Sequence, residues 1–282
     1  MHALPIVLAS TAWLAAHGAA SAAAPMVATF RSLDGTLLSA QVVLPAGAAK
    51  GTVVALHGCG GLFAAQGTRK GGLNARHQGM ADFLVAEGYA VVFPDSLTPR
   101  GEKELCTQKI GQRAVGQVQR RADALAAVAW AAAQPWTPSQ RVALLGWSHG
   151  GSAVLGSTDA RRADVTAQAV RPAVAVAFYP GCSAALQAGY RPSTRLVLML
   201  GEKDDWTAPG PCVELGRATN AEVNLYAGSY HDFDNPVGKV RLRHDVPNGV
   251  NPGQGVHVGA NPQARAQSYG RLLQLLAEAF QR

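Results

Sequence analysis

The residues with the clearest potential for chemistry are Gly146-Trp147-Ser148-His149-Gly150. An apolar run over residues 142–145 leads into this Gly-x-Ser-x-Gly pattern, and a run of small residues follows it. The pattern predicts a buried strand, a sharp turn that presents the Ser148 hydroxyl, and the start of a helix. Side chains in place of Gly146 and Gly150 would collide with the turn. The pentapeptide alone can also arise by chance in a chain with 31 glycines, so a base and an acid must be found elsewhere.

A serine hydroxyl needs a base that accepts its proton, and His231 is our candidate. It follows the last predicted parallel strand, in a loop at the sheet edge where Ser148 also lies. The base needs a carboxylate, and Asp204 and Asp205 both follow the strand predicted over 196–200. We prefer Asp204, because Gly-x-x-Asp at a strand end is the commoner spacing, and Asp205 is the alternative acid. The chain order is then Ser, Asp, His.

Two backbone N–H groups are candidates for an oxyanion hole. His149 begins the helix after Ser148, where free N–H groups and the positive end of the helix dipole face the serine. Cys59 belongs to the glycine-rich segment 57–61, which follows the strand predicted over 51–56 and would supply the second N–H. The segment is alternatively a tight turn or a phosphate loop, although it lacks the Lys-Ser/Thr ending of a nucleotide-binding loop.

The remaining histidines are not expected to form a site. His57 ends a predicted strand and is expected to pack structurally, while His77, His244 and His257 have no evident partner. No Cys-x-x-Cys spacing supports zinc, and we predict no metal site.

Composition limits the class of protein. The chain has 282 residues, of which 48% are hydrophobic and 15% charged, so it can bury a sizeable core and is not expected to be disordered. The net charge is +7, but the basic residues are scattered and no aromatic-interleaved basic stripe occurs. We therefore expect a basic solvated surface and no nucleic-acid partner.

Residues 1–24 are similar to an export signal. The apolar core from Leu4 to Ala16 is too short to span a bilayer, and small-residue cleavage patterns end at Ala22 and Ala24. We prefer a cut after Ala22, because a cut after Ala24 would place Pro25 next to the scissile bond. An uncleaved anchor or a wrongly assigned start is the alternative. No later stretch is long and apolar enough to be a transmembrane helix, so we expect a protein exported to the periplasm or secreted, without stable membrane insertion.

The four cysteines favour disulfides in an exported chain. Three pairings are possible. Cys182 follows one predicted strand and Cys212 lies after the next, so these two could meet, which leaves Cys59 with Cys106.

Strands and helices alternate from residue 51 to the C-terminus. This pattern predicts one α/β domain over residues 25–282, with a mostly parallel sheet covered by helices on both faces. Segments 96–111 and 234–260 are expected to be a surface excursion and a long loop or irregular hairpin. The predicted elements are a hairpin over 30–43, strands over 51–56, 89–93, 141–145, 173–178, 196–200 and 223–226, and helices over 80–87, 112–133, 211–219 and 262 to the end.

At its motifs the chain resembles the dienelactone hydrolase family of α/β-hydrolases, from about residue 30 to the end. The resemblance is carried by residues 57–61, 146–150, 179–182, 201–207 and 230–233. It implies the α/β-hydrolase fold and the hydrolysis of a small-molecule ester or lactone with no cofactor. Two departures argue against dienelactone itself as the substrate: the founding members use a cysteine nucleophile where this chain has a serine, and they are cytoplasmic.

Three functions follow from these observations. A serine esterase or lactonase is our first choice. A serine peptidase of the same fold is the second, although we find no propeller-like domain and no acidic pair that would hold a peptide amine. A non-catalytic exported binding protein is the third, because a fold alone does not determine function.

Overall fold

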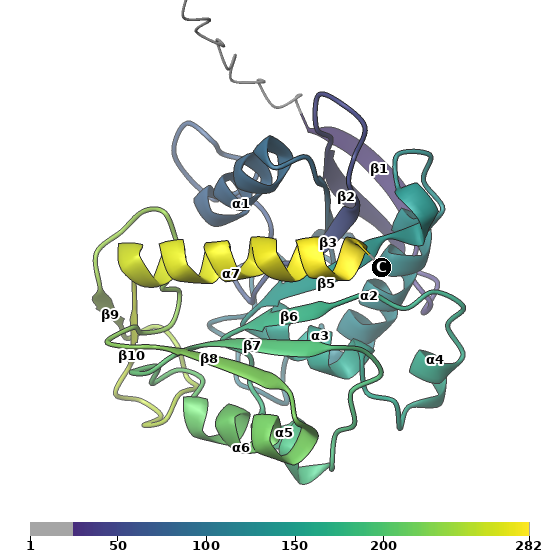
Figure 1. Cartoon of the computed structure of the whole chain (residues 1–282). Helices are drawn as coiled ribbons and strands as arrows, with labels where there is room; N and C mark the ends of the chain where they lie inside the picture. Colours follow the sequence, from purple (N-terminus) through teal and green to yellow (C-terminus); the bar gives the residue numbers. More distant parts are fainter. Residues whose placement is uncertain (1–24, 282) are drawn as a thin grey trace, which may run out of the picture.

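The computed structural model describes residues 25–281, so the predicted export signal over residues 1–24 lies outside the described residues. An eight-stranded sheet runs through the centre in the order β1-β2-β4-β3-β5-β6-β7-β8 (Figure 1). The first three strands in this order pair antiparallel, and every other pair is parallel. The strands are β1 (Met26–Arg31), β2 (Leu37–Val43), β3 (Thr52–Leu56), β4 (Ala90–Asp95), β5 (Val142–Trp147), β6 (Ala175–Phe178), β7 (Leu196–Gly201) and β8 (Glu222–Tyr226).

The five strands β3 to β7 are buried along their whole length. Strands covered on both faces need apolar side chains at every position, which explains why they are continuous apolar runs in the sequence. The hairpin of β1 and β2, by contrast, alternates between buried and more exposed positions and turns at Asp34-Gly35. The predicted fold class and hairpin are therefore confirmed.

Helices cover both faces of the sheet. Helices α1 and α7 pack on one face, where α7 crosses the sheet in Figure 1, and α2, α3 and α6 pack on the other. The helices are α1 (Ala75–Ala86), α2 (Gln117–Ala132), α3 (His149–Ser157), α4 (Ala163–Thr166), α5 (Ser183–Gln187), α6 (Pro209–Thr219) and α7 (Pro262–Phe280), with short 3₁₀ turns over Thr98–Arg100 and Pro138–Gln140.

Helix ends follow local chemistry, and two predicted starts are wrong. Helix α1 begins at Ala75 rather than at residue 80, because the Asn74 side chain caps it there by accepting the His77 N–H. The Asn261 side chain caps α7 by accepting the N–H of Ala264 at 3.2 Å. Gly88 adopts a φ of 86° just after α1, a conformation that favours glycine. Helix α2 begins at Gln117 rather than at residue 112, because Gly116 forms an extended N-cap there. In addition, segment 234–260 contains a short antiparallel hairpin, β9 (Arg241–Arg243) and β10 (Val256–Val258).

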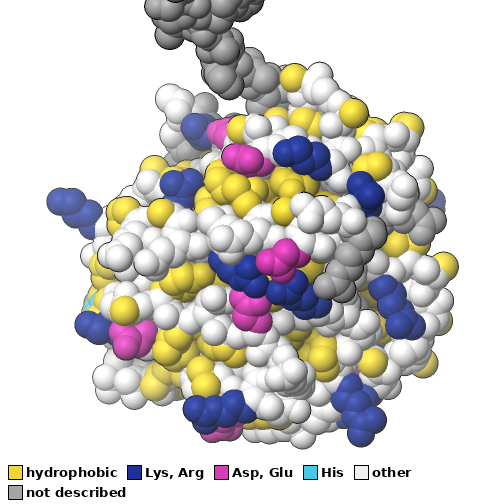
Figure 2. Space-filling view, in the orientation of Figure 1, with side chains coloured by type: hydrophobic (Ala, Val, Ile, Leu, Met, Phe, Trp, Pro, Cys, Tyr) yellow, Lys and Arg dark blue, Asp and Glu magenta, His cyan; other side chains and the backbone are white. Residues whose placement is uncertain are grey.

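Charged side chains are dispersed over the molecular face seen in Figure 2, and several basic groups there lie beside acidic ones. Arg195 and Arg271, for example, both pair with Glu222 and Glu278. Within residues 25–281, no helix combines the length and the apolar character needed to cross a membrane.

Candidate active site

Ser148 lies in a strained turn between β5 and α3. Its backbone has φ 53° and ψ −115°, a conformation that costs about 1–3 kcal/mol for a residue with a side chain. A Cβ atom at Gly150 would lie 2.1 Å from the carbonyl oxygen of Leu56, and one at Gly146 would lie 2.4 Å from that of Gly150. Only glycine therefore fits at either position. The turn is further fixed by the Ser148 N–H, which donates to the Phe178 carbonyl at 2.9 Å.

The His231 ring is buried and held by a carboxylate. Its Nδ1 lies 2.7 Å from Oδ2 of Asp204, and the two side chains are almost fully excluded from solvent. The ring also packs between Tyr179 and Trp206, with centroid distances of 4.4 Å and 4.8 Å. Because Asp204 binds Nδ1, the Nε2 atom is left to face other groups, and it has no hydrogen-bond partner among the described residues.

Asp204 is itself fixed by the loop that follows β7. Its Oδ1 accepts the backbone N–H groups of Trp206 and Thr207, both at 2.9 Å. The Thr207 hydroxyl lies 3.0 Å from Asp204 Oδ2 and 3.0 Å from the carbonyl oxygen of Tyr179. Hydrogen bonds to an ionised carboxylate are strong. The loop therefore fixes the position of the Asp204 carboxylate independently of its contact with His231.

Asp205, the alternative acid, binds His257 rather than His231. Its Oδ2 lies 2.7 Å from Nδ1 of His257, and its Oδ1 accepts the His257 N–H at 2.8 Å. The Asp205 carbonyl also accepts the N–H of Val250 at 2.9 Å. The expectation that His257 lacks a partner is therefore wrong: it joins segment 234–260 to the acid loop, a pairing over 52 residues that spacing does not reveal.

Ser148 and His231 line the same cavity, which has a volume of about 130 Å³. No hydrogen bond joins the two side chains within the described part of the chain. Ser148, Tyr179 and Asp232 all line it with positive φ, at 53°, 37° and 72°. Backbone strain of this kind clusters at functional sites. The lining residues are Gly58, Cys59, Gly60, Gly61, Asn74, Arg76, Cys106, Ser148, Tyr179, Trp206, His231, Asp232, Arg241, Arg243 and Val258.

The glycine-rich segment approaches the serine turn closely. A Cβ atom at Gly58 would lie only 3.5 Å from Cβ of Ser148. The backbone N–H groups of Cys59 and His149 have no hydrogen-bond acceptor within residues 25–281. His149 is the first residue of α3, where an unpaired N–H and the helix dipole favour negative charge. Of these two residues, Cys59 lines the same cavity as Ser148, and His149 directly follows it in the chain.

A buried arginine, Arg120, binds the backbone of the glycine-rich segment 57–61. Arg120 donates to the His57 carbonyl at 2.6 Å and is 1% exposed. The His57 ring donates from Nδ1 to the Gly58 carbonyl at 2.8 Å, and its Nε2 accepts the N–H of Ser96 at 3.2 Å. Burial, and then the charge of Arg120, hold the pKa of His57 well below its usual range, so the ring is neutral. His57 thus packs structurally, as expected.

A second buried group, missed by the sequence analysis, lies behind the cavity. Asp234 is fully buried and accepts the Trp147 Nε1–H at 2.7 Å and the Tyr179 hydroxyl at 2.5 Å. Arg76 lies 3.6 Å from Asp234 and forms an ion pair with Asp232. This network fixes the walls around the serine turn.

Both predicted disulfides are present: Cys59 with Cys106, and Cys182 with Cys212. The first lines the cavity and the second does not. In the described part of the chain, no group of three or more His, Cys, Asp or Glu side chains is arranged to hold a metal ion.

The strand order, with the strained Ser148 after β5, Asp204 after β7 and His231 after β8, defines an α/β-hydrolase fold. The sequence pattern of the dienelactone hydrolase family matches residues 41–280, and the chain belongs to this family.

Solved structures of low sequence identity share the fold. The dienelactone hydrolase-like promiscuous phosphotriesterase P91, from metagenomic libraries, is 18% identical with a TM-score of 0.62, covering 91% of this chain and 99% of its own. Thermogutta terrifontis esterase 2, phosphorylated by paraoxon, is 14% identical with a TM-score of 0.61, covering 90% and 94%. Brefeldin A esterase, a bacterial homologue of human hormone-sensitive lipase, is 16% identical with a TM-score of 0.60, covering 96% and 81%. Comparison with the curated proteins finds no match.

Proposed function

We propose that this chain hydrolyses a carboxylic ester or lactone through an acyl-enzyme on Ser148. One observation carries the proposal: Ser148, on a strained turn, lines the same cavity as His231, whose ring is held by Asp204 at 2.7 Å. A nucleophile, a base and a group that orients the base are the minimum for this chemistry. Membership of the dienelactone hydrolase family supports the same reaction class.

The contact between His231 and Asp204 supports one direction of proton transfer. Asp204 accepts the Nδ1–H of His231, which leaves Nε2 unprotonated and able to accept the Ser148 hydroxyl proton. The serine oxygen then attacks the carbonyl carbon, and the substrate oxygen becomes negative. The N–H groups of Cys59 and His149 stabilise that oxygen. The His231 imidazolium donates its new proton to the leaving alkoxide. Water, deprotonated by His231, then attacks the acyl-enzyme carbonyl, which releases the carboxylic acid and restores the Ser148 hydroxyl.

The proposal is tested by Ser148→Ala. Loss of the nucleophile lowers kcat for a p-nitrophenyl ester by about 10⁵- to 10⁶-fold, because the base alone cannot form the acyl-enzyme. Ser152→Ala is the matched control: Ser152 lies in the first turn of α3, just after Ser148, and does not line the cavity, so this variant should keep its activity. Full activity of the Ser148→Ala protein would refute the assignment.

Labelling separates the alternative functions. Thermogutta terrifontis esterase 2 is phosphorylated by paraoxon, and a fluorophosphonate probe should react with Ser148 by the same type of displacement. A non-catalytic binding protein would stay unlabelled, whereas an esterase and a peptidase would both be labelled. A panel of matched esters, lactones and amides then distinguishes these two, and we expect turnover of the esters and lactones only.

We also propose that residues 25–282 form one domain that works outside the cytoplasm. The two disulfides support an oxidising compartment, because such bonds rarely persist in the cytosol. The signal-like pattern before Ala22 supports the same location. N-terminal sequencing of protein recovered from the periplasm or medium should give a chain beginning at residue 23.

A further inference from the structure

The Cys59–Cys106 disulfide forms part of the cavity wall. Both cysteines line the cavity, and they are 5% and 4% exposed. Cys59 carries one of the two N–H groups that lack an acceptor, while Cys106 lies 47 residues away in a separate surface segment. The bond therefore fastens a proposed oxyanion donor to a segment that is remote in sequence.

Other contacts show that this surface segment supports the glycine-rich segment directly. The Leu105 N–H donates to the Cys59 carbonyl at 2.8 Å. Gly61 adopts a φ of 78°, and a Cβ atom there would lie 2.5 Å from the Lys103 carbonyl oxygen. The Glu104 carboxylate accepts the Cys106 N–H at 2.7 Å, which orders the segment around the cysteine.

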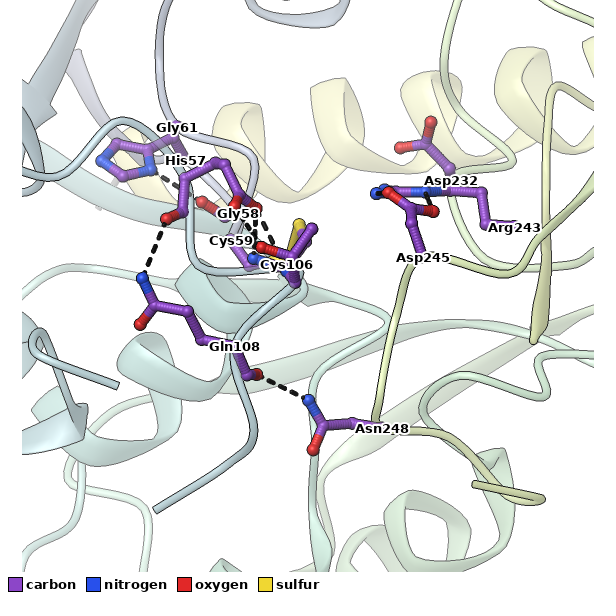
Figure 3. Close-up of a disulfide and its surroundings, with 12 residues drawn as sticks. His57, Gly58, Cys59, Gly61, Cys106, Gln108, Asp232, Arg243, Asp245 and Asn248 are labelled. Carbon is purple, nitrogen blue, oxygen red and sulfur yellow. Dashed lines mark hydrogen bonds and ion pairs between the residues drawn. A yellow bond between two sulfur atoms is a disulfide. The ribbon is translucent and has the colours of Figure 1, made fainter. Parts of the chain in front are cut away.

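On its far side the same segment is bound to the hairpin beside His231. Asn248 donates to the Gln108 carbonyl at 2.9 Å (Figure 3). It also accepts the Ile110 N–H at 3.0 Å. The hairpin in turn meets His231, whose carbonyl accepts the Gly259 N–H at 3.0 Å. A small apolar cluster fills the space between these segments: Cys59, Leu97, Leu105, Cys106, Val115, Val246, Val256 and Val258.

The second disulfide has no such location. Cys182–Cys212 joins the segment after β6 to α6 and lines no part of the cavity. Its cysteines belong to the main core on the α2 and α3 face of the sheet. The chain therefore contains one disulfide at the proposed oxyanion donor and one remote from it, and the remote disulfide serves as the control for the first.

We propose that the Cys59–Cys106 disulfide is a positioning element of the oxyanion hole, so that the active site is fully assembled only when this bond is oxidised. The inference rests on the proposed function and names a regulation of that same site. Gly58, Gly60 and Gly61 give the segment wide backbone freedom, and the cross-link removes it. The N–H of Cys59 must point at the substrate oxygen, and small misplacements in an active site are costly in rate.

Reduction by a dithiol tests the inference with a balanced reaction. The dithiol supplies two electrons and two protons, the Cys59 and Cys106 sulfurs each become thiols, and the dithiol closes to its own disulfide. The product keeps every backbone N–H, including that of residue 59. Any loss of rate then comes from the position of the donor rather than from its removal.

The experiment uses the full mature chain and two double variants. In Cys182→Ala/Cys212→Ala, Cys59–Cys106 is the only remaining disulfide, and in Cys59→Ala/Cys106→Ala, Cys182–Cys212 is the only one. Each protein is assayed oxidised, treated with dithiothreitol, and reoxidised. The readouts are kcat and KM for a p-nitrophenyl ester, the affinity of a boronic acid that forms a tetrahedral serine adduct, and near-ultraviolet circular dichroism.

We expect reduction of Cys182→Ala/Cys212→Ala to lower kcat about 10- to 100-fold with KM unchanged, as for a misplaced oxyanion donor. Boronic acid affinity should fall in parallel, the dichroism should stay native, and reoxidation should restore the rate. Oxidised Cys59→Ala/Cys106→Ala should already be slow, with no further response to dithiothreitol.

Two outcomes would overturn the inference but not the proposed function. In the first, the oxidised protein is active and labelled by fluorophosphonate, but its kcat does not change on reduction. In the second, every loss of rate is accompanied by loss of the native dichroism. The second would mean that the bond only stabilises the fold. Oxidised protein that is neither labelled by fluorophosphonate nor active would instead overturn the proposed function, and this inference with it.

Discussion

The cavity has two sides that are built differently. On the strand-end side, defined here as residues 146–150, 179 and 204, the chain leaves parallel strands and is held by backbone sterics. On the loop side, defined as residues 97–111 and 234–260, short elements are joined by a disulfide, by the amide of Asn248 and by the Asp205–His257 pair. The first side presents the groups we propose for bond breaking, and the second encloses them.

The two sides differ in how many independent contacts define them. A Cβ atom at Gly146 or Gly150 would collide with backbone atoms, so the backbone of the serine turn cannot shift to accept a side chain at either position. The loop side depends on one disulfide and a few side-chain hydrogen bonds. Each hydrogen bond is worth about 1 kcal/mol, so losing one loosens the loop side without unfolding the sheet. The comparison predicts that equal chemical changes on the two sides have unequal effects.

Adjacent aspartates give the largest expected contrast. Asp204→Asn should lower kcat about 10⁴-fold, because an amide can donate to Nδ1 and stabilise the wrong tautomer of His231. Asp205→Asn removes a charge from the pair with His257. We expect this change to destabilise the ordered hairpin by about 1 kcal/mol and to lower kcat less than tenfold. Steady-state kinetics on both proteins measures the contrast. Similar losses for the two variants would mean that the acid is wrongly assigned.

Two glycines of the same segment give the next largest contrast. Gly150→Ala would force a methyl group to within 2.1 Å of the Leu56 carbonyl oxygen, and we expect more than about 3 kcal/mol of destabilisation. Gly156 lies in the same helix, and a methyl group there would meet only the Arg121 side chain at 3.8 Å. Gly156→Ala should therefore stabilise the protein by about 0.5–1 kcal/mol. Urea unfolding of both proteins measures the difference, and a tolerated Gly150→Ala would contradict the steric argument.

The same division explains what the sequence could predict. The strand ends that carry Ser148, Asp204 and His231 follow from apolar runs and chain order, because parallel strands bring their carboxyl ends to one edge. The cysteine pairing followed from the same reasoning. The side-chain hydrogen bonds of the loop side did not follow, since the partners of His257 and Asn248 depend on the path of a long segment rich in Gly and Pro.

One missed residue did leave a signal in the sequence. Arg120 lies four, seven and eleven residues before Ala124, Ala127 and Ala131, on the apolar face of α2 that packs against the sheet. A basic residue on a buried helix face requires a polar partner, and here that partner is the His57 carbonyl. Asp234 left no comparable signal, because the aspartate that follows His231 in the sequence, Asp232, is equally plausible from spacing alone.

Acid should destabilise the fold through three buried histidine rings, of which only His149 belongs to the strand-end side. Burial holds the pKa values of His57 and His149 well below the usual range and lowers that of His77 to about 3. Unfolding exposes these rings, which then bind protons below about pH 6.5. The unfolded chain therefore binds more protons than the folded one, and stability must fall as the pH falls.

The stability from these three rings is complete above about pH 6.5 and is lost progressively toward their folded pKa values. Each contributes a slope of about 1.4 kcal/mol per pH unit, so urea unfolding at several pH values between 7.5 and 5 should give a steep decline. His77→Gln should remove one share of that slope, whereas His244→Gln, at an exposed position, serves as the matched control. An unfolding free energy that stays level over this range would mean that the buried rings take up protons without unfolding, which would contradict the prediction.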